Sequence, residues 1–325
     1  MHIIVFLLAL ALGCPRASSS SNAMPVFPDG SERCVLSIVM VGRNDEWQAG
    51  GGLGNFSTRL AASVTAFILH AERLELKCQV IVVDYNPPHD TLSLRRQFFR
   101  QATGVQGSAW RHSDLIFVTV PHTVHVQVKK ITVWRAYDAK LFEYVAKNAG
   151  LRAARCKYVL VTNPDIVPGR ALMDFLHSSL SHTAAERSGV SDARAAGEHD
   201  VNDLPLSLFL SDGKFVTMAR TNARLPIPLH LVSAGDLAKM QDALAQDSPP
   251  PTHAPGDFLL ASRARWFEIG GFPEIGSNAG GDDIACKLLN FSGTNATRPG
   301  AALILLKHPL VIYHQPHLGD AIRTA

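Results

Sequence analysis

The sequence predicts an α/β fold with a mostly parallel sheet and flanking helices, and two observations lead to this expectation. Several short runs, such as Lys157-Tyr-Val-Leu-Val161, are apolar without alternation, which is typical of strands buried on both faces. In the first half of the chain these runs alternate with segments whose apolar residues recur at helical spacing. Strands that alternate with helices favour a parallel sheet with crossover helices over a sandwich or a bundle.

The predicted elements follow one another closely from residue 35 onward. Ser57 is expected to cap the first helix, because a serine hydroxyl can accept a hydrogen bond from an exposed amide of the first turn. In order, the elements are a strand over Val35–Val41, a helix with Leu60, Val64, Phe67, Ile68, Ala71 and Leu74 on its apolar face, a strand over Val80–Val83, a strand over Leu115–Val120, a helix over about Tyr137–Arg155 and a strand over Lys157–Val161.

The first 33 residues have the composition of a targeting segment and a linker. An apolar stretch from Ile3 to Leu12 is too short to span a bilayer comfortably, which takes about 20 residues, and it predicts a signal peptide over residues 1–17. The alternative is a short signal anchor, and only this alternative would bring the protein to a membrane. Residues 18–33 are expected to form a flexible linker. Both interpretations place the body in the lumen of the secretory pathway or outside the cell.

Further features fit an oxidising, glycosylating compartment. The chain holds sequons at Asn55, Asn290 and Asn295, and removal of the leader takes Cys14 away and leaves four cysteines. Three of them, Cys34, Cys78 and Cys156, each precede a predicted strand and should gather at one edge of the sheet. A disulfide from Cys34 to Cys78 or to Cys156 is therefore expected, and four buried thiols are the alternative.

Composition excludes some classes of function. The chain has 325 residues, 46% of them hydrophobic, which is enough for a large core. Its formal net charge is only +3, and it has no Lys/Arg block. Nucleic acid is therefore not an expected partner.

Polar side chains stand where the predicted strands end. Asp84 follows one strand, and Asn163 and Asp165 follow another within the stretch VTNPDIVPG. Ligands of such sheets bind at the carboxyl ends of the strands. Oxygen ligands one residue apart can hold a hard divalent cation together with a substrate's phosphates. The alternative is that Asn-Pro-Asp only makes the turn that ends the strand.

Later motifs complete a resemblance to a known family. They are "GDFLLASRARWFEIGGFPE" from Gly256, "GGDDIACKLL" from Gly280 and "VIYHQPH" from Val311, after "LSIVMVGRND", "VIVVDYNP" and "FEYVAKNAGLRAARCKYVLVTNPDIV" earlier in the chain. Together these motifs resemble nucleotide-sugar-dependent glycosyltransferases of the GT-A fold, of the family 2 type, with features of the galactosyltransferase C-terminal region. The resemblance implies a Rossmann-like domain whose nucleotide-sugar-binding half is residues 34–180 and whose acceptor-binding and catalytic half is residues 181–325.

The resemblance implies a role for each matching donor-side residue. Asp84 would contact the base or ribose of the nucleotide, and Arg43 would reach the nucleotide or its diphosphate. Asn163-Pro-Asp165 occupies the position of the family's Asp-x-Asp motif, so Asp165 would ligate Mn²⁺ or Mg²⁺. Asn163 departs from the motif by one negative charge, which implies weaker metal binding or a hydrogen bond to ribose instead.

The resemblance also implies the remaining site residues. Asp283, or alternatively Asp282, would be the general base that deprotonates the acceptor hydroxyl; two acids favoured at a helix N-terminus are the alternative. His314 or His317 would complete the metal site with Asp165. The acceptor pocket would involve Gly256, Asp257 and Trp266, although a helical tryptophan is more typical of the core.

The sequence thus predicts a metal-dependent glycosyltransferase that is inverting and non-processive. It would move a sugar from a UDP-type donor to a hydroxyl of a glycan, glycoprotein or other acceptor. The sequence has "SRARW" but no Gln-x-x-Arg-Trp motif, which disfavours a processive membrane synthase. The alternatives are a secreted carbohydrate- or nucleotide-sugar-binding protein without activity, and a nucleotidyltransferase, which the loop Ala49–Asn55 does not favour.

Overall fold

The structure of the protein is a computed structural model. It describes residues 34–44, 56–102, 110–131, 139–181, 206, 210, 213–218, 220–223, 227–245, 257–272, 274, 303–306 and 310–315. The helices and strands are β1 (Leu36–Gly42), α2 (Phe56–Leu74), β2 (Cys78–Tyr85), α3 (Leu94–Gln101), β3 (Ser113–Val120), α4 (His122–Ile131), α5 (Glu143–Ala153), β4 (Tyr158–Thr162), β5 (Ile166–Pro168), α6 (Arg170–Ser181), β6 (Phe215–Met218), β7 (Arg220–Asn222), α8 (Leu229–Ala234), α9 (Leu237–Ala245), β8 (Phe258–Ser262), α10 (Arg263–Glu268), β9 (Leu303–Leu306) and β10 (Ile312–His314).

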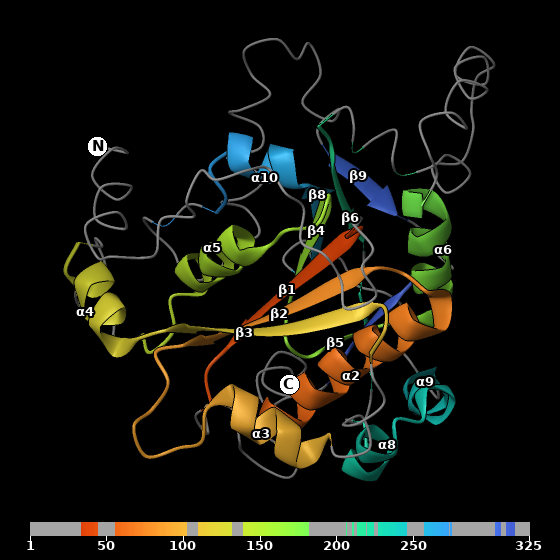
Figure 1. The fold of residues 1–325 in the computed structure, drawn as a ribbon, viewed down its shortest axis with the longest axis horizontal. Helices are drawn as coiled ribbons and strands as arrows, with labels where there is room; N and C mark the ends of the chain where they lie inside the picture. The colour runs from red at the N-terminus through yellow and green to blue at the C-terminus, as the bar shows by residue number, and fades with distance from the viewer. Residues whose placement is uncertain are drawn as a thin grey trace, which may run out of the picture.

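The main sheet has seven strands in the order β3-β2-β1-β4-β8-β6-β9 (Figure 1). The four strands from β3 to β4 are parallel to one another; β8 is antiparallel to both of its neighbours, and β6 and β9 are parallel. The predicted α/β fold with a mostly parallel sheet is therefore confirmed.

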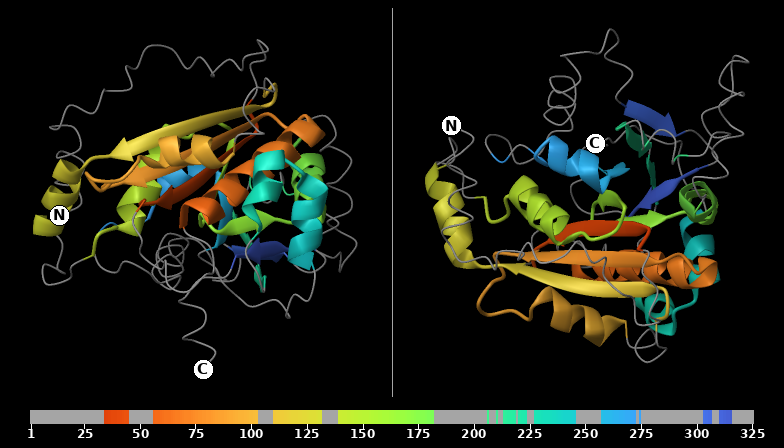
Figure 2. Two further views of the ribbon diagram at one scale, coloured as in Figure 1. Left: turned by 90° about the horizontal axis from the view of Figure 1, so that it is seen from below. Right: turned by 45° about the horizontal axis from the view of Figure 1, so that its top comes forward.

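Strand β1 lies inside the sheet because its residues are apolar on both faces. Leu36, Ile38 and Met40 pack in one core cluster, together with α2 residues such as Phe67. Val39 and Val41 pack in a second cluster with residues of α5 and α10. Figure 2 shows the corresponding layers, with α2 and α3 on one face of the sheet and α5 and α10 on the other. A run that is buried on both faces needs no polar alternation, which is why the apolar pattern predicted this strand.

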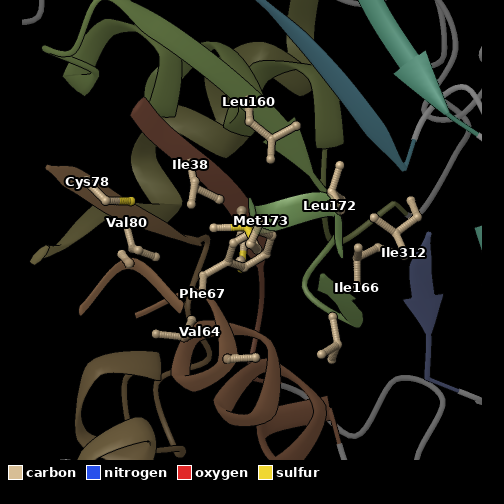
Figure 3. Close-up of a cluster of buried hydrophobic side chains, with 14 of the residues drawn as sticks. Ile38, Val64, Phe67, Cys78, Val80, Leu160, Ile166, Leu172, Met173 and Ile312 are labelled. Carbon is tan, nitrogen blue, oxygen red and sulfur yellow. The ribbon is translucent and has the colours of Figure 1, made fainter. Parts of the chain in front are cut away.

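Figure 3 shows the first of these clusters. Phe67 and Val64 of α2 point toward Ile38 of β1 and Val80 of β2, and each of these side chains is fully buried. Leu160 of β4 lies in the same cluster, which thus joins three parallel strands to one helix. The apolar spacing of the predicted helix accounts for this packing.

Two predicted helix boundaries differ from the structure. α2 begins at Phe56, so Ser57 lies inside its first turn and the predicted cap is wrong. The Ser57 hydroxyl accepts a hydrogen bond from Gln101 Nε2 of α3 at 3.0 Å and so links two helices. The helix expected from Tyr137 begins only at Glu143, after extended backbone at Phe142.

A second sheet of three short strands, in the order β5-β10-β7, lies beyond the end of β4. β10 is antiparallel to β5, with His314 opposite Ile166, and parallel to β7, with His314 opposite Asn222. This sheet therefore brings residues 311–315, the described part of the C-terminal motif, beside the Asn-Pro-Asp turn.

Cys34 and Cys156 form a disulfide at the amino edge of the main sheet, with their Cα atoms 4.6 Å apart. This selects one of the two predicted pairings, while Cys78 is a buried free thiol. Residues 1–33 and the three sequon asparagines lie outside the described residues. In the described part of the chain, no helix combines the length and the apolarity needed to cross a membrane.

Candidate active site

The polar residues predicted from the strand ends lie along one edge of the main sheet. Gly42 of β1 stands opposite Asp84 of β2, and Val39 of β1 stands opposite Val161 of β4. These strands are parallel. Arg43, Asp84 and Asn163 therefore lie at the same edge of the sheet, where the carboxyl ends of the strands meet. This is the edge at which sheets of this kind bind ligands.

Asp84 is a buried carboxyl at this edge, with 2% of its surface exposed. Its Oδ2 accepts a hydrogen bond of 3.0 Å from the Leu94 amide, which begins α3. Burial raises the pKa of Asp84, and the Leu94 hydrogen bond and the charge of Arg43 only partly oppose this rise. Asp84 is thus a fixed group that can act as a hydrogen-bond partner for a ligand beside Arg43.

Asn86 holds the loop that follows Asp84. Its φ is 46°, a left-handed conformation that asparagine adopts more readily than most residues. Its carbonyl accepts from Arg43 Nε at 2.7 Å, its Nδ2 donates to the Lys140 carbonyl at 2.9 Å, and its Oδ1 lies 2.9 Å from His122 Nδ1. Asn86 was not predicted from the sequence, although an asparagine directly before two prolines is a turn signal.

Asn163 lies between two charged side chains. Its Oδ1 accepts a hydrogen bond from Lys147 Nζ at 3.3 Å, and its Nδ2 donates to Asp257 Oδ1 at 2.6 Å. Lys147 also pairs with Glu143 on α5 at 2.5 Å, and Arg220 of β7 pairs with Asp257 at 2.6 Å. No pattern in the sequence indicates that Lys147 and Arg220 belong to the site. They come close to Asn163 and Asp257 only in the folded chain.

Asp165 lies in the turn between β4 and β5, next to β10. Its carbonyl accepts a hydrogen bond of 2.9 Å from the Gln315 amide, and the backbone of His314 lies opposite Ile166. The fold thus places the predicted carboxylate ligand and one of the two predicted histidine positions on neighbouring strands. The side chain of His314 and all of His317 lie outside what the structure describes.

The donor set at this turn fits a divalent cation only in part. A carboxylate and a neighbouring histidine are ordinary ligands of such ions. Asn163 does not fit as a further ligand, because its oxygen faces the Lys147 ammonium. Among the described side chains, no group of three or more His, Cys, Asp or Glu is arranged to hold a metal ion.

The remaining predicted residues are distributed as follows. Asp257 lies just before β8 and is buried, with both carboxylate oxygens bonded to protein donors. Trp266 lies on α10 with 1% of its surface exposed; it stacks on Phe272, and its Nε1 donates to the Val159 carbonyl at 3.0 Å. The structure thus places Trp266 in the core rather than in an acceptor pocket. Gly256, Asp282 and Asp283 lie outside the described residues.

No protein-family model and no curated protein matches this chain. Among solved structures, it is similar to residues 1–349 of S. aureus TarS, with 12% identity over 86% of this chain and 60% of that one and a TM-score of 0.40. It is also similar to TarS 1–349 in complex with UDP-GlcNAc, with 10% identity over 89% of this chain and 61% of that one and a TM-score of 0.42.

A third similar structure is the mannosyltransferase PcManGT from Pyrobaculum calidifontis, in complex with GDP-Man and Mn²⁺. The identity is 17% over 99% of this chain and 71% of that one, with a TM-score of 0.44. Similarity at this level does not carry the activities of these proteins over to this chain. Glycosyltransferases, the class that the sequence motifs resemble, are nevertheless among the solved structures similar to it.

Proposed function

We propose that the protein is a glycosyltransferase that moves a sugar from a nucleotide donor, of the UDP type, to a hydroxyl of a glycan, glycoprotein or other acceptor. The observation that carries this proposal is the shared carboxyl edge, where Arg43, Asp84 and Asp165 stand at successive strand ends. Arg43 and Asp84 would bind the nucleotide, with the loop at Asn86 holding Arg43 in place.

Asp165 would hold Mn²⁺ or Mg²⁺ together with His314 or His317. When bound, the cation would neutralise the departing diphosphate. Asp165 is suited to this role because β10 fixes its backbone through the Gln315 amide. Asp283, or Asp282, would take the proton of the acceptor hydroxyl as that oxygen attacks the anomeric carbon from the opposite face, which gives inversion. Release of the acceptor after each transfer would make the reaction non-processive.

The proposed location is the secretory pathway or the cell exterior. The Cys34–Cys156 disulfide supports this location, because disulfides persist in oxidising compartments and are rare in the cytosol. Mass spectrometry of the protein purified from its natural source tests the proposal. A reduced Cys34 together with unglycosylated sequons would contradict it.

The proposed activity is tested by incubating the purified protein with UDP- and GDP-sugars and Mn²⁺, with and without EDTA. Release of the nucleoside diphosphate and binding of the donor are both followed. Asp165→Asn should abolish metal-dependent donor binding. The matched control is Asp114→Asn, because Asp114 is an exposed aspartate at the opposite, amino edge of the sheet. Failure of every donor to bind would overturn the proposal.

The same assay separates the proposal from a protein that binds sugars without transferring them. Such a protein is a specific alternative here, because the amide of Asn163 is already engaged by Lys147 and Asp257. Donor binding without release of the diphosphate, in the presence of a broad panel of sugar acceptors, would favour this alternative.

A further inference from the structure

Two ion pairs flank the end of β4, and in each of them one partner is buried. On one side, Lys147 of α5 pairs with Glu143, and 3% of the Lys147 side chain is exposed. On the other side, Arg220 of β7 pairs with Asp257, whose side chain is 6% exposed. Charges removed from water need partners on all sides, so each pair depends on the polar groups around it.

Asn163 is the group that joins these two pairs. Its amide oxygen accepts from the Lys147 ammonium, and its amide nitrogen donates to the Asp257 carboxylate at 2.6 Å. The neighbouring Thr162 hydroxyl donates to the Asp257 carbonyl at 2.6 Å, which fixes the same segment a second time. The resulting chain runs Glu143, Lys147, Asn163, Asp257, Arg220 and connects α5, the end of β4, the start of β8 and β7.

The middle of this chain needs a side chain that can both accept and donate a hydrogen bond, as the Asn163 amide does. The group must accept a hydrogen bond from a cation at one end and donate one to an anion at the other. An ionised carboxylate has no donor. An aspartate here would therefore set two carboxylates against each other across the 2.6 Å that now separates Asn163 Nδ2 from Asp257 Oδ1. Like charges at such a distance cannot both ionise freely.

We infer that Asn163 is a positioning residue, whose amide locks Asp257 and Lys147 at the carboxyl edge beside Asp165. Asp257 excludes an acidic residue from position 163. The hydrogen-bond network therefore requires the asparagine, which is not a weakened metal ligand. The inference goes beyond the proposed function, because it holds whichever donor the protein binds.

A charge-exchange experiment tests this inference. The four proteins are the wild type, Asn163→Asp, Asp257→Asn and the double variant. Asparagine and aspartate have nearly the same shape, so the set changes charge and donors with little change in volume. Two measurements are made on the purified chain: the Tm at pH 7.5, and the affinity for Mn²⁺ alone by electron paramagnetic resonance.

Asn163→Asp should lower the Tm at pH 7.5 by about 5 °C or more, because the hydrogen bond that joins the two ion pairs is replaced by a contact between two carboxylates. The double variant restores one amide and one carboxylate, so it should regain at least half of the Tm lost by Asn163→Asp. The affinity for Mn²⁺ should not increase in Asn163→Asp.

Asn44→Asp is the matched control, because it adds the same charge at the same edge. Asn44 donates to the Leu92 carbonyl and not to an acid. Asp257→Asn should therefore not rescue Asn44→Asp. If the single variant is too unstable to purify, recovery of a folded protein in the double variant still supports the inference, and failure of both to fold contradicts it.

Two results would overturn the inference. One is an unchanged Tm in Asn163→Asp together with a tenfold gain in Mn²⁺ affinity, which would make position 163 a metal-ligand position. The other is a double variant no more stable than the sum of the single changes predicts. Neither measurement uses a nucleotide sugar, so failure here is distinguishable from failure of the proposed function.

Discussion

His70 makes the stability of the protein depend on pH. It lies on α2 and is fully buried. Burial and the Arg73 guanidinium, whose Nη2 lies 3.4 Å from His70 Nδ1, together lower the pKa of His70 from 6.5 to about 4, while the Asp174 carboxylate opposes the shift. The folded protein therefore keeps His70 neutral over a range in which the unfolded chain protonates it. Stability should be complete above the unfolded pKa and decrease as the pH falls from 6.5 toward 4.

The size of this loss follows from the shift. One pKa unit corresponds to about 1.4 kcal/mol, and the two values imply a loss of about 2.5 kcal/mol between pH 7 and about pH 4.5. Urea unfolding at both values measures it. Other groups also titrate in this range, so the informative quantity is the difference between the wild type and His70→Gln, whose side chain does not titrate.

His70→Gln should lose about 2.5 kcal/mol less than the wild type over the same range. The control is His230→Gln, because His230 is exposed on α8. Equal losses in the wild type and in His70→Gln would refute the reasoning, since they would mean that folding does not keep the buried imidazole neutral.

Three further substitutions test other features of the structure. Replacing both Cys34 and Cys156 by alanine should reduce the free energy of unfolding by about 4 kcal/mol, because the disulfide closes a loop over a separation of 122 residues; unfolding in urea with and without reductant measures it. Asp84→Asn should keep or raise the Tm at neutral pH, because it removes a buried carboxyl whose pKa is raised by folding. The same substitution should lower the affinity for UDP at least tenfold in a calorimetric titration. Gly150→Ala should destabilise the protein by about 1–2 kcal/mol, although alanine has the better helix propensity, because the new Cβ would lie within 2.3 Å of Val39 Cγ1. Urea unfolding measures this change. An unchanged midpoint would contradict the tight packing of α5 on β1.

The central strands could be predicted from the sequence because their signal is local. The run expected over Val35–Val41 is β1 at Leu36–Gly42, shifted by one residue. The apolar positions from Leu60 to Ala71 are likewise buried in α2, and Leu74 is partly buried. Such patterns depend only on the period of the element and on which faces are buried.

The second sheet could not be predicted in the same way. β5, β7 and β10 have three residues each, too few to show a period. Their pairing joins Ile166 to His314, residues far apart in the sequence, through main-chain hydrogen bonds that any residue type can make. The expectation that a C-terminal histidine approaches Asp165 came from the family resemblance, and the register of β10 places the backbone of His314 accordingly.

Some site residues have a local signal in the sequence, and others are placed only by the fold. Asp84 and Asn163 could be predicted because each is a polar residue at the end of an apolar run. Lys147 was not found, because a lysine on an amphipathic helix is normally exposed. It is buried here because Glu143 one turn earlier and Asn163 directly after β4 both bond its ammonium.

The pattern of ion pairs at the edge also bears on the proposed need for a metal. Lys147 and Arg220, which could have faced a diphosphate, each have a carboxylate partner within 2.6 Å, and the Asn163 amide fixes both pairs. The pairs are neutral as a whole, so they do not offset the carboxylate of Asp165 near by. A diphosphate placed beside Asp165 would therefore meet a negative charge that neither of these two pairs offsets. A divalent cation between Asp165 and the diphosphate removes this repulsion. The Asn163 amide, which is unsuitable as a metal ligand, keeps Lys147 and Arg220 in their ion pairs and away from the diphosphate. Donor binding should therefore depend on a metal held by Asp165.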